Sequence, residues 1–456
     1  MSKTVMFVGA HNRREIDFYI LIAKRLAKEG IRSKFISQYQ RYAIELSRTE
    51  GVDIVAIPHW IQSNWRDIPD LTAAVDTAEL KYGLTSLRQV FNGDRELFES
   101  EEAECVDRSL RYFEAWEALF NAEPINAVVS AIGGELIRTT SFFAAKRHGI
   151  RTLYLNFFPL PHRFVLVSTL HGDFLDLDLT CVPDLSPEQD SEAQMLLDQL
   201  RGQASRFFIW QPPALKAEYV SKTVSRLYFS LFADRYAYPS RWVVRKAWYL
   251  VQRSSNYLLS RLLYEYPHLD RKFVFFPLHD SEDFQLRVRA PHCQNQEFIV
   301  RLVADSLPIG YELYVKEHPN FLGGISTTAL RQIKQIPRVR LLSPAVSALD
   351  LISAARAVVT INSTVGFEAI VRSKPVISLG PSFYRGKGLT SDVGNFYDLP
   401  VTIKQTIGTK PDERLVKKFL YYAVRKTWLG DYTLRDFSDE NIGHVAHAIL
   451  EELDRV

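Results

Sequence analysis

The chain has 456 residues, of which 46% are hydrophobic and 24% charged, and its formal net charge is +3. This composition is ordinary for a globular protein of two or three domains, and so small a charge does not favour a nucleic-acid-binding protein. The three cysteines are far apart and form no CxxC pair, which argues against a disulfide framework or a zinc ribbon. Because the chain shows no secretory signal and no run of 18 apolar residues, we expect a cytoplasmic protein without a membrane span.

The N-terminal part alternates strand-like and helix-like segments. Residues 4–9 read as a buried strand, and residues 15–30 have helical apolar spacing that ends at Gly30, a C-cap signal. Further strands are predicted at 33–37, 52–57, 125–134 and 150–155, and further helices at 109–121 and 135–149. This alternation predicts a mostly parallel sheet covered by helices on both faces.

The pattern blurs between about 157 and 270, where proline and aromatic residues are frequent. From Lys216 to Arg261 there are nine basic residues and only two acidic ones, with aromatic and leucine residues between them. We interpret this stretch as a helical interdomain segment on the acceptor side. It either contacts an anionic membrane surface or forms a solvated helical face.

From residue 272 the alternation of strands and helices returns. Strands are predicted at 272–278, 311–319, 357–362 and 374–380, and helices at 296–307, 346–355, 364–373, 413–430 and 441–456. The predicted fold is therefore α/β of the GT-B type, with two Rossmann-like parallel-sheet domains facing a cleft. The expected divisions are an acceptor-side domain (1–156), the helical segment (157–270), a donor domain (271–412) and C-terminal helices (413–456).

The stretch INSTVGFEAI predicts a phosphate site. A strand ends at Asn362, and a helix begins at once with Ser363 and Thr364 as capping residues. The free N–H groups of a first helical turn attract anions, Gly366 would let a ligand approach, and Glu368 could accept from ribose hydroxyls. The alternative is an ordinary capped helix behind a strand.

The stretch YVKEHPN follows a strand of the same predicted sheet and places Lys316, His318 and Pro319 at its end. His318 could donate to a phosphate oxygen or protonate a leaving phosphate, and Lys316 would add a second cation. The alternative is a histidine that is hydrogen-bonded at a strand end and has no ligand.

The stretch PLHDSEDFQLR follows another strand and carries three carboxylates, Asp280, Glu282 and Asp283. A carboxylate there could be a general base or a nucleophile at an anomeric carbon. The alternative is a solvated acidic loop.

The order and spacing of these stretches, with KPVISLGPSFY after them, resemble the bacterial capsule polysaccharide biosynthesis family over about residues 270–400. That family includes retaining β-Kdo transferases, which take 3-deoxy-D-manno-oct-2-ulosonic acid (Kdo) from CMP-β-Kdo. The resemblance implies that Asp283 is the matching carboxylate, while His279 replaces the usual glutamine. The His-Pro and Ser-Thr pairs also resemble those of bacterial sialyltransferases, and in both groups they bind the CMP phosphate.

The resemblance implies a glycosyltransferase without a cofactor, whose partners are a nucleotide-sugar donor and a glycan or lipid-linked glycan acceptor. We expect it in the cytoplasm, with peripheral contact to the inner membrane surface and no nucleic acid. Candidate acceptor contacts are His11, Glu135, His279 and Tyr384; Glu135 could instead favour a helix N-terminus, and Tyr384 could belong to a plain loop. No cluster has the spacing of metal ligands. The alternatives are a GT-B enzyme using CMP-sialic acid, a UDP-sugar or CDP-glycerol, and a non-catalytic glycan-binding partner.

Overall fold

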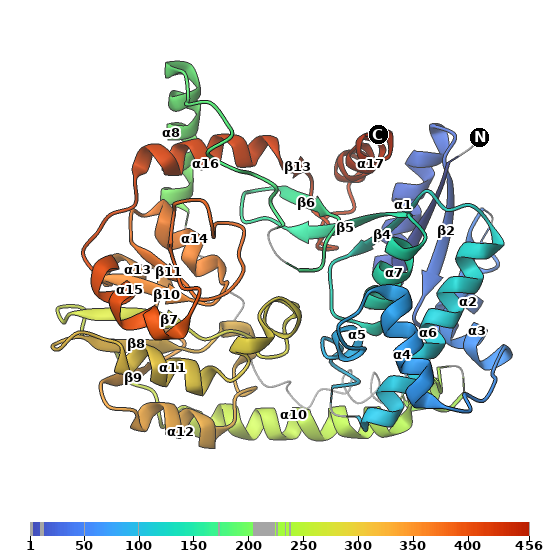
Figure 1. Cartoon of the computed structure of the whole chain (residues 1–456), viewed down its shortest axis with the longest axis horizontal. Helices are drawn as coiled ribbons and strands as arrows, with labels where there is room; N and C mark the ends of the chain where they lie inside the picture. The colour runs from blue at the N-terminus through green and yellow to red at the C-terminus, as the bar shows by residue number, and fades with distance from the viewer. Residues whose placement is uncertain are drawn as a thin grey trace. The chain divides into compact units, whose positions relative to one another are not determined.

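The computed structural model describes all residues except 1–2, 10–12, 50, 99, 172–173, 204–223, 225–226, 233, 237–238 and 456. The chain divides into two α/β units (Figure 1). Unit 1 comprises Met1–Leu170, Leu215–Lys246 and Thr427–Val456, and unit 2 comprises His171–Ala214 and Ala247–Lys426.

Unit 1 is built on a seven-stranded sheet with the order β13-β6-β5-β4-β1-β2-β3. Its strands are β1 (Thr4–Gly9), β2 (Arg32–Ser37), β3 (Asp53–Ala56), β4 (Ala127–Ala131), β5 (Arg151–Phe157), β6 (Arg163–Val167) and β13 (Trp428–Leu429). The strands from β3 to β5 pair in parallel, whereas β6 and β13 add antiparallel pairs at one edge. β1 is buried along its whole length, as its continuous apolar run predicts for a central parallel strand.

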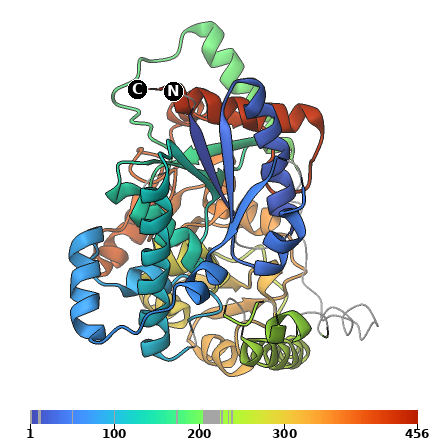
Figure 2. The same ribbon diagram turned by 90° about the vertical axis from the view of Figure 1, so that its right-hand side faces the viewer.

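The helices of unit 1 cover this sheet. They are α1 (Arg13–Lys28), α2 (Gln40–Leu46), α3 (Ile57–Ser63), α4 (Leu71–Tyr82), α5 (Arg88–Phe91), α6 (Glu102–Ala122), α7 (Leu136–Arg147) and α17 (Asp439–Asp454). α17 packs on α1, so the two ends of the described chain lie side by side (Figures 1 and 2). Lys3 Nζ donates to the carboxylate of Asp454 at 2.6 Å, which ties these ends together.

Unit 2 contains a six-stranded, fully parallel sheet with the order β12-β11-β10-β7-β8-β9. Its strands are β7 (Phe273–Pro277), β8 (Glu312–Lys316), β9 (Val339–Leu342), β10 (Ala357–Thr360), β11 (Val376–Ser378) and β12 (Ser391–Asp392). The strand order reverses direction between β7 and β10. Such a switch point is where open α/β sheets bind ligands, beyond the carboxyl ends of the strands.

The helices of unit 2 are α8 (Pro187–Gly202), α11 (Gln296–Asp305), α12 (Thr327–Gln335), α13 (Ala348–Ala354), α14 (Thr364–Val371), α15 (Leu399–Thr406) and α16 (Glu413–Arg425). A π-helical turn at Gln285–Arg289 and 3₁₀ turns at Pro291–Cys293, Pro319–Phe321 and Phe396–Asp398 complete its described helices. α8 packs along α16, where Lys417 Nζ donates to Asp190 at 2.6 Å. The long helix α10 (Ser240–Ser260) contains the residue at which the chain passes from unit 1 to unit 2.

The predicted architecture of two α/β units with a parallel sheet in each is confirmed. The structure divides the chain differently from the sequence-based boundaries, however. Residues 157–270 are shared between both units, and the C-terminal residues 413–456 are split. The reason is that β13 pairs with β6 and α17 packs on α1, so the end of the chain completes unit 1.

Candidate functional site

Three polar segments meet at one edge of the unit 2 sheet. β10, β7 and β8 are parallel neighbours, so their carboxyl ends lie at the same edge. Pro277 is in register with Lys316, and the N–H of Leu278 donates to the Lys316 carbonyl at 2.8 Å. Asn362, which follows β10, donates from Nδ2 to the Gln285 carbonyl at 2.7 Å. The structure therefore brings the three sequence motifs together within unit 2.

Lys316 and His318 lie at the end of β8. Burial lowers the pKa of the Lys316 ammonium, and the Glu368 carboxylate acts in the opposite direction. Nδ1 of His318 accepts from the main-chain N–H of Asn320 at 3.3 Å, so the neutral ring carries its proton on Nε2. Burial also lowers the pKa of His318; Asp280 opposes this shift and Lys316 adds to it. At neutral pH, His318 is therefore an uncharged ring with an Nε2–H donor.

Two side-chain hydrogen bonds fix the backbone at the start of α14. Ser363 is the N-cap, and its Oγ accepts from the N–H of Val365 at 3.2 Å. Thr360 Oγ1 accepts in turn from the N–H of Ser363 at 3.1 Å. Ser363 and Thr364 are half-buried, and Glu368 is half-buried about one turn further along. The arrangement fits an anion at the helix start, next to Lys316 and His318.

Tyr384 supports this helix and is not available to an acceptor. The side chain is fully buried, and its hydroxyl donates to the Ser363 carbonyl at 2.7 Å. The same hydroxyl explains Gly366, because a Cβ at that position would lie 2.4 Å from the Tyr384 oxygen. The predictions that Tyr384 contacts the acceptor and that Gly366 gives space to a ligand are therefore wrong. Both residues hold the helix start in place.

His279 and Pro319 are also buried at this edge. Burial lowers the pKa of His279 to about 3, and repulsion from His318, when that ring is protonated, acts in the same direction. Its main-chain N–H donates to Gln296 Oε1 at 2.7 Å, and its carbonyl accepts from Gln296 Nε2 at 3.1 Å. Since its ring is enclosed and neutral, the prediction that His279 contacts an acceptor is wrong. Pro319 begins the 3₁₀ turn that fixes the backbone after His318.

The carboxylate loop between β7 and the π-helical turn places its acidic residues differently. Asp280 Oδ1 accepts from the N–H of Glu282 at 2.8 Å, and Asp280 is the carboxylate that acts on the pKa of His318. Asp283 is half-buried, and its carbonyl accepts from the N–H of Arg287 at 2.9 Å as the π-helical turn begins. Turns of this kind are frequent at functional sites. Asp283 thus stands where the loop leaves the sheet edge.

A pocket of about 440 Å³ lies beside these motifs, beyond the ends of β11 and β12. Its lining includes His292, Gly380, Arg385, Gly394 and Phe396. The Arg385 guanidinium donates to the carbonyls of Ser378 (2.9 Å) and Val393 (2.7 Å), which hold it at the pocket wall. Among the residues that the structure describes, no carboxylate forms an ion pair with Arg385. The Arg385 guanidinium therefore contributes positive charge to the pocket wall.

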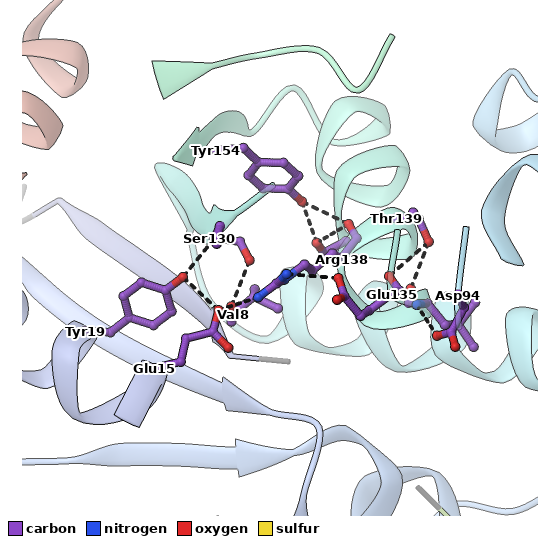
Figure 3. Close-up of polar contacts among 12 residues, drawn as sticks. Val8, Glu15, Tyr19, Asp94, Ser130, Glu135, Arg138, Thr139 and Tyr154 are labelled. Carbon is purple, nitrogen blue, oxygen red and sulfur yellow. Dashed lines mark hydrogen bonds and ion pairs between the residues drawn. The ribbon is translucent and has the colours of Figure 1, made fainter. Parts of the chain in front are cut away.

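In unit 1, Glu135 belongs to a buried ionic cluster after β4 (Figure 3). Arg138 Nη1 donates to Glu135 Oε2 at 2.9 Å, and Arg138 Nη2 donates to the buried Glu15. Tyr19 also donates from its hydroxyl to Glu15, at 3.2 Å. Burial alone would lower the pKa of Arg138, but Glu135 and Glu15 together raise it above its usual value. The Glu135 side chain is about one quarter exposed, and its role at an acceptor remains a prediction.

The start of α7 is capped from a distant part of the chain. Asp94 accepts from the main-chain N–H groups of Leu136 and Glu96, both at 2.8 Å, and burial raises its pKa. Gly134 allows this approach, because a Cβ there would lie 2.5 Å from the Gly93 carbonyl oxygen. Sequence reasoning missed Asp94, which stands 42 positions before its partner.

His11, the remaining candidate acceptor contact, lies outside the described residues. Over the part of the chain that the structure describes, no group of three or more histidine, cysteine or acidic residues is arranged to hold a metal ion. Within the same residues, no helix is both long and apolar enough to cross a membrane.

Residues 217–431 match the protein family described as "Capsule polysaccharide biosynthesis protein". Protein FixF of Sinorhizobium fredii is 32% identical over 163 residues, which are 34% of this chain and 38% of FixF. The capsule polysaccharide export protein KpsS of Escherichia coli is 29% identical over 201 residues, 42% of this chain and 49% of KpsS. The chain thus spans less than half the length of either relative.

Among solved structures, the β Kdo 2,4 transferase KpsC of Thermosulfurimonas dismutans is similar with a TM-score of 0.41 and 17% identity. The similarity covers 71% of this chain and 88% of that structure.

Sequence reasoning missed a buried carboxyl next to His318. Burial raises the pKa of Glu317 to about 7, although the Tyr264 hydroxyl and Arg253 favour the charged form. The Tyr264 hydroxyl donates to one carboxyl oxygen of Glu317. The run of three ionisable residues in KEHP signals that one side chain must turn inward, but not which one.

Proposed function

We propose that the chain is a glycosyltransferase of bacterial surface polysaccharide synthesis that transfers Kdo from CMP-β-Kdo with retention. One observation carries this proposal. A neutral His318, a buried Lys316 and the start of α14 lie on neighbouring strand ends, beside a loop that carries Asp283. His318, Lys316 and the start of α14 fit a donor phosphate. The carboxylate of Asp283 fits the anomeric carbon, which needs a nucleophile.

The roles follow the motif positions. His318 Nε2–H and the first N–H groups of α14 would hold the phosphate, Lys316 would supply positive charge, and Glu368 would accept from the ribose. Asp283 would attack the anomeric carbon. Neither Asn362, which is locked to the Gln285 carbonyl, nor Tyr384 needs to touch the donor, because both fix the loops that do.

The pocket beyond β11 and β12 supports an acidic sugar. A ulosonic acid carries a carboxylate beside its anomeric carbon, and the Arg385 guanidinium at the pocket wall has no carboxylate partner among the described residues. The neutral sugars of most UDP-linked donors would leave this charge uncompensated. The acceptor would be a glycan or a lipid-linked glycan at the cytoplasmic face of the membrane. The name of KpsS, a capsule polysaccharide export protein, supports a place in the same process.

A donor screen tests the proposal. The full chain is incubated with a glycan acceptor panel and one of CMP-Kdo, CMP-sialic acid, UDP-sugars or CDP-glycerol, and free nucleotide is measured. We expect acceptor-dependent CMP release from CMP-Kdo alone. Turnover of a UDP- or CDP-linked donor would replace the donor assignment. Binding of glycans without turnover of any donor would favour the non-catalytic glycan-binding partner.

His318→Ala should weaken CMP binding by roughly tenfold to a hundredfold, because a hydrogen bond to a charged group contributes about 1.5–3 kcal/mol. His318→Gln is the matched control, since its amide can donate from nearly the position of Nε2, and it should lose less affinity. Titration calorimetry measures the CMP affinity of both variants and of the wild type. Equal affinity of the wild type and His318→Ala would remove His318 from the phosphate site.

A further inference from the structure

The helix α10 has two different faces. Trp242, Val243 and Ser260 are buried, and Arg253 anchors the same face by donating to the carbonyls of Asn320 (2.6 Å) and Leu322 (3.0 Å). The packed side of the helix therefore already has its partners within the protein. The opposite side of α10 does not follow the usual rule that a helix turns a polar face outward.

That opposite side carries a stripe of exposed apolar residues. The spacing of four, three, seven and four residues places them along one side of the helix and of the turn that follows it. The members are between 57% and 83% exposed. We call this set the α10 stripe: Val244, Trp248, Val251, Leu258 and Leu262. Contiguous apolar surface of this kind marks an interaction site.

The charged residues of the helix itself have a single sign. From residue 240 to residue 262 the chain has no acidic residue and five basic ones: Arg241, Arg245, Lys246, Arg253 and Arg261. Arg241 and Arg261 are exposed, and Arg241 forms an ion pair with Glu104 while Lys246 forms one with Glu96. An exposed apolar stripe with a tryptophan, on a helix whose own charged residues are all basic, has the composition of a helix that lies in the interface of an anionic membrane.

We propose that the α10 stripe docks on an anionic lipid surface, with Trp248 and its neighbours inserted between the headgroups and the exposed Arg241 and Arg261 close to lipid phosphates. A second copy of this chain is a less favourable binding partner for the α10 stripe. Although the spacing resembles a coiled-coil seam, pairing two such helices would bring basic residues together without an acidic residue on either helix to offset them. This inference does not depend on the proposed transfer reaction.

Vesicle sedimentation tests the proposal with the full chain and no turnover. We expect binding to vesicles of phosphatidylglycerol and phosphatidylcholine, much weaker binding to phosphatidylcholine alone, and a decrease with salt. The double variant Trp248→Glu/Val251→Glu should lower the partition coefficient at least about tenfold, because it adds two charges where apolar side chains would insert. Leu80→Glu on α4 is the matched control, since Leu80 is 87% exposed outside the stripe, and it should bind like the wild type.

Three results would overturn the proposal. These are no binding to anionic vesicles, equal binding to neutral ones, or unchanged binding of the double variant. Light scattering after size exclusion gives the oligomeric state in parallel. A dimer that the double variant dissociates, without vesicle binding by the wild type, would assign the stripe to a second copy. Circular dichroism of each variant checks that its secondary structure is retained.

Discussion

Asp283→Asn is expected to lower sugar transfer by several orders of magnitude while leaving CMP binding nearly intact. Retention is most simply reached by two successive inversions, which require a nucleophile on the protein. The amide keeps the shape of the carboxylate but cannot form the covalent sugar intermediate. Loss of a nucleophile that works with its neighbours as a unit costs far more than loss of a binding contact.

The other two carboxylates of the same loop, Asp280 and Glu282, provide comparison variants for Asp283→Asn. Glu282→Gln is the matched control and should retain most of the activity. Asp280→Asn keeps the oxygen that accepts from the Glu282 N–H and removes the charge that raises the pKa of His318; because the His318 ring is already neutral, we expect a much smaller loss than for Asp283→Asn. Intact mass spectrometry of the wild type with CMP-Kdo should show a covalent sugar adduct that Asp283→Asn lacks. If Asp280→Asn abolishes the adduct and Asp283→Asn does not, Asp280 is the nucleophile.

The shared location of the three sequence motifs could be predicted from the sequence because parallel strands all end at one edge of a sheet. Once 272–278, 311–319 and 357–362 were recognised as strands of one sheet, the residues after them had to share that edge. The order of the strands then made β10, β7 and β8 direct neighbours, which the sequence alone did not show. The apolar runs of these strands are long enough to identify them without tertiary information.

The functions assigned to Tyr384, Gly366 and His279 could not be predicted in the same way. A glycine after a capping serine suggests space for a ligand, and only the structure shows that a tyrosine 18 residues later fills that space. His279 follows a strand end as His318 does, yet one ring is enclosed and the other is half-buried. Which side chain turns inward depends on packing between distant segments, which local pattern does not encode.

Arg138 offers the largest expected effect on stability. Its side chain is buried in unit 1 between Glu15, which is also buried, and Glu135, which is partly exposed (Figure 3). Arg138→Met should destabilise unit 1 by about 3–5 kcal/mol, because it leaves the Glu15 carboxylate buried without its cation. Glu135→Gln should cost much less, since water reaches that carboxylate and screens its ion pair.

Adding Glu15→Gln to Arg138→Met should recover part of the loss, because no uncompensated charge then remains in the interior. Hydrogen exchange followed by mass spectrometry separates the two units, which a single unfolding curve of a two-unit chain would not. Faster exchange is expected in peptides from β4 and α7, whereas peptides from β7 and β8 serve as an internal reference. If Arg138→Met accelerates exchange in β4 and α7 no more than Glu135→Gln does, the buried pair is not what stabilises this region. The cluster would then owe its stability to the apolar residues packed around it.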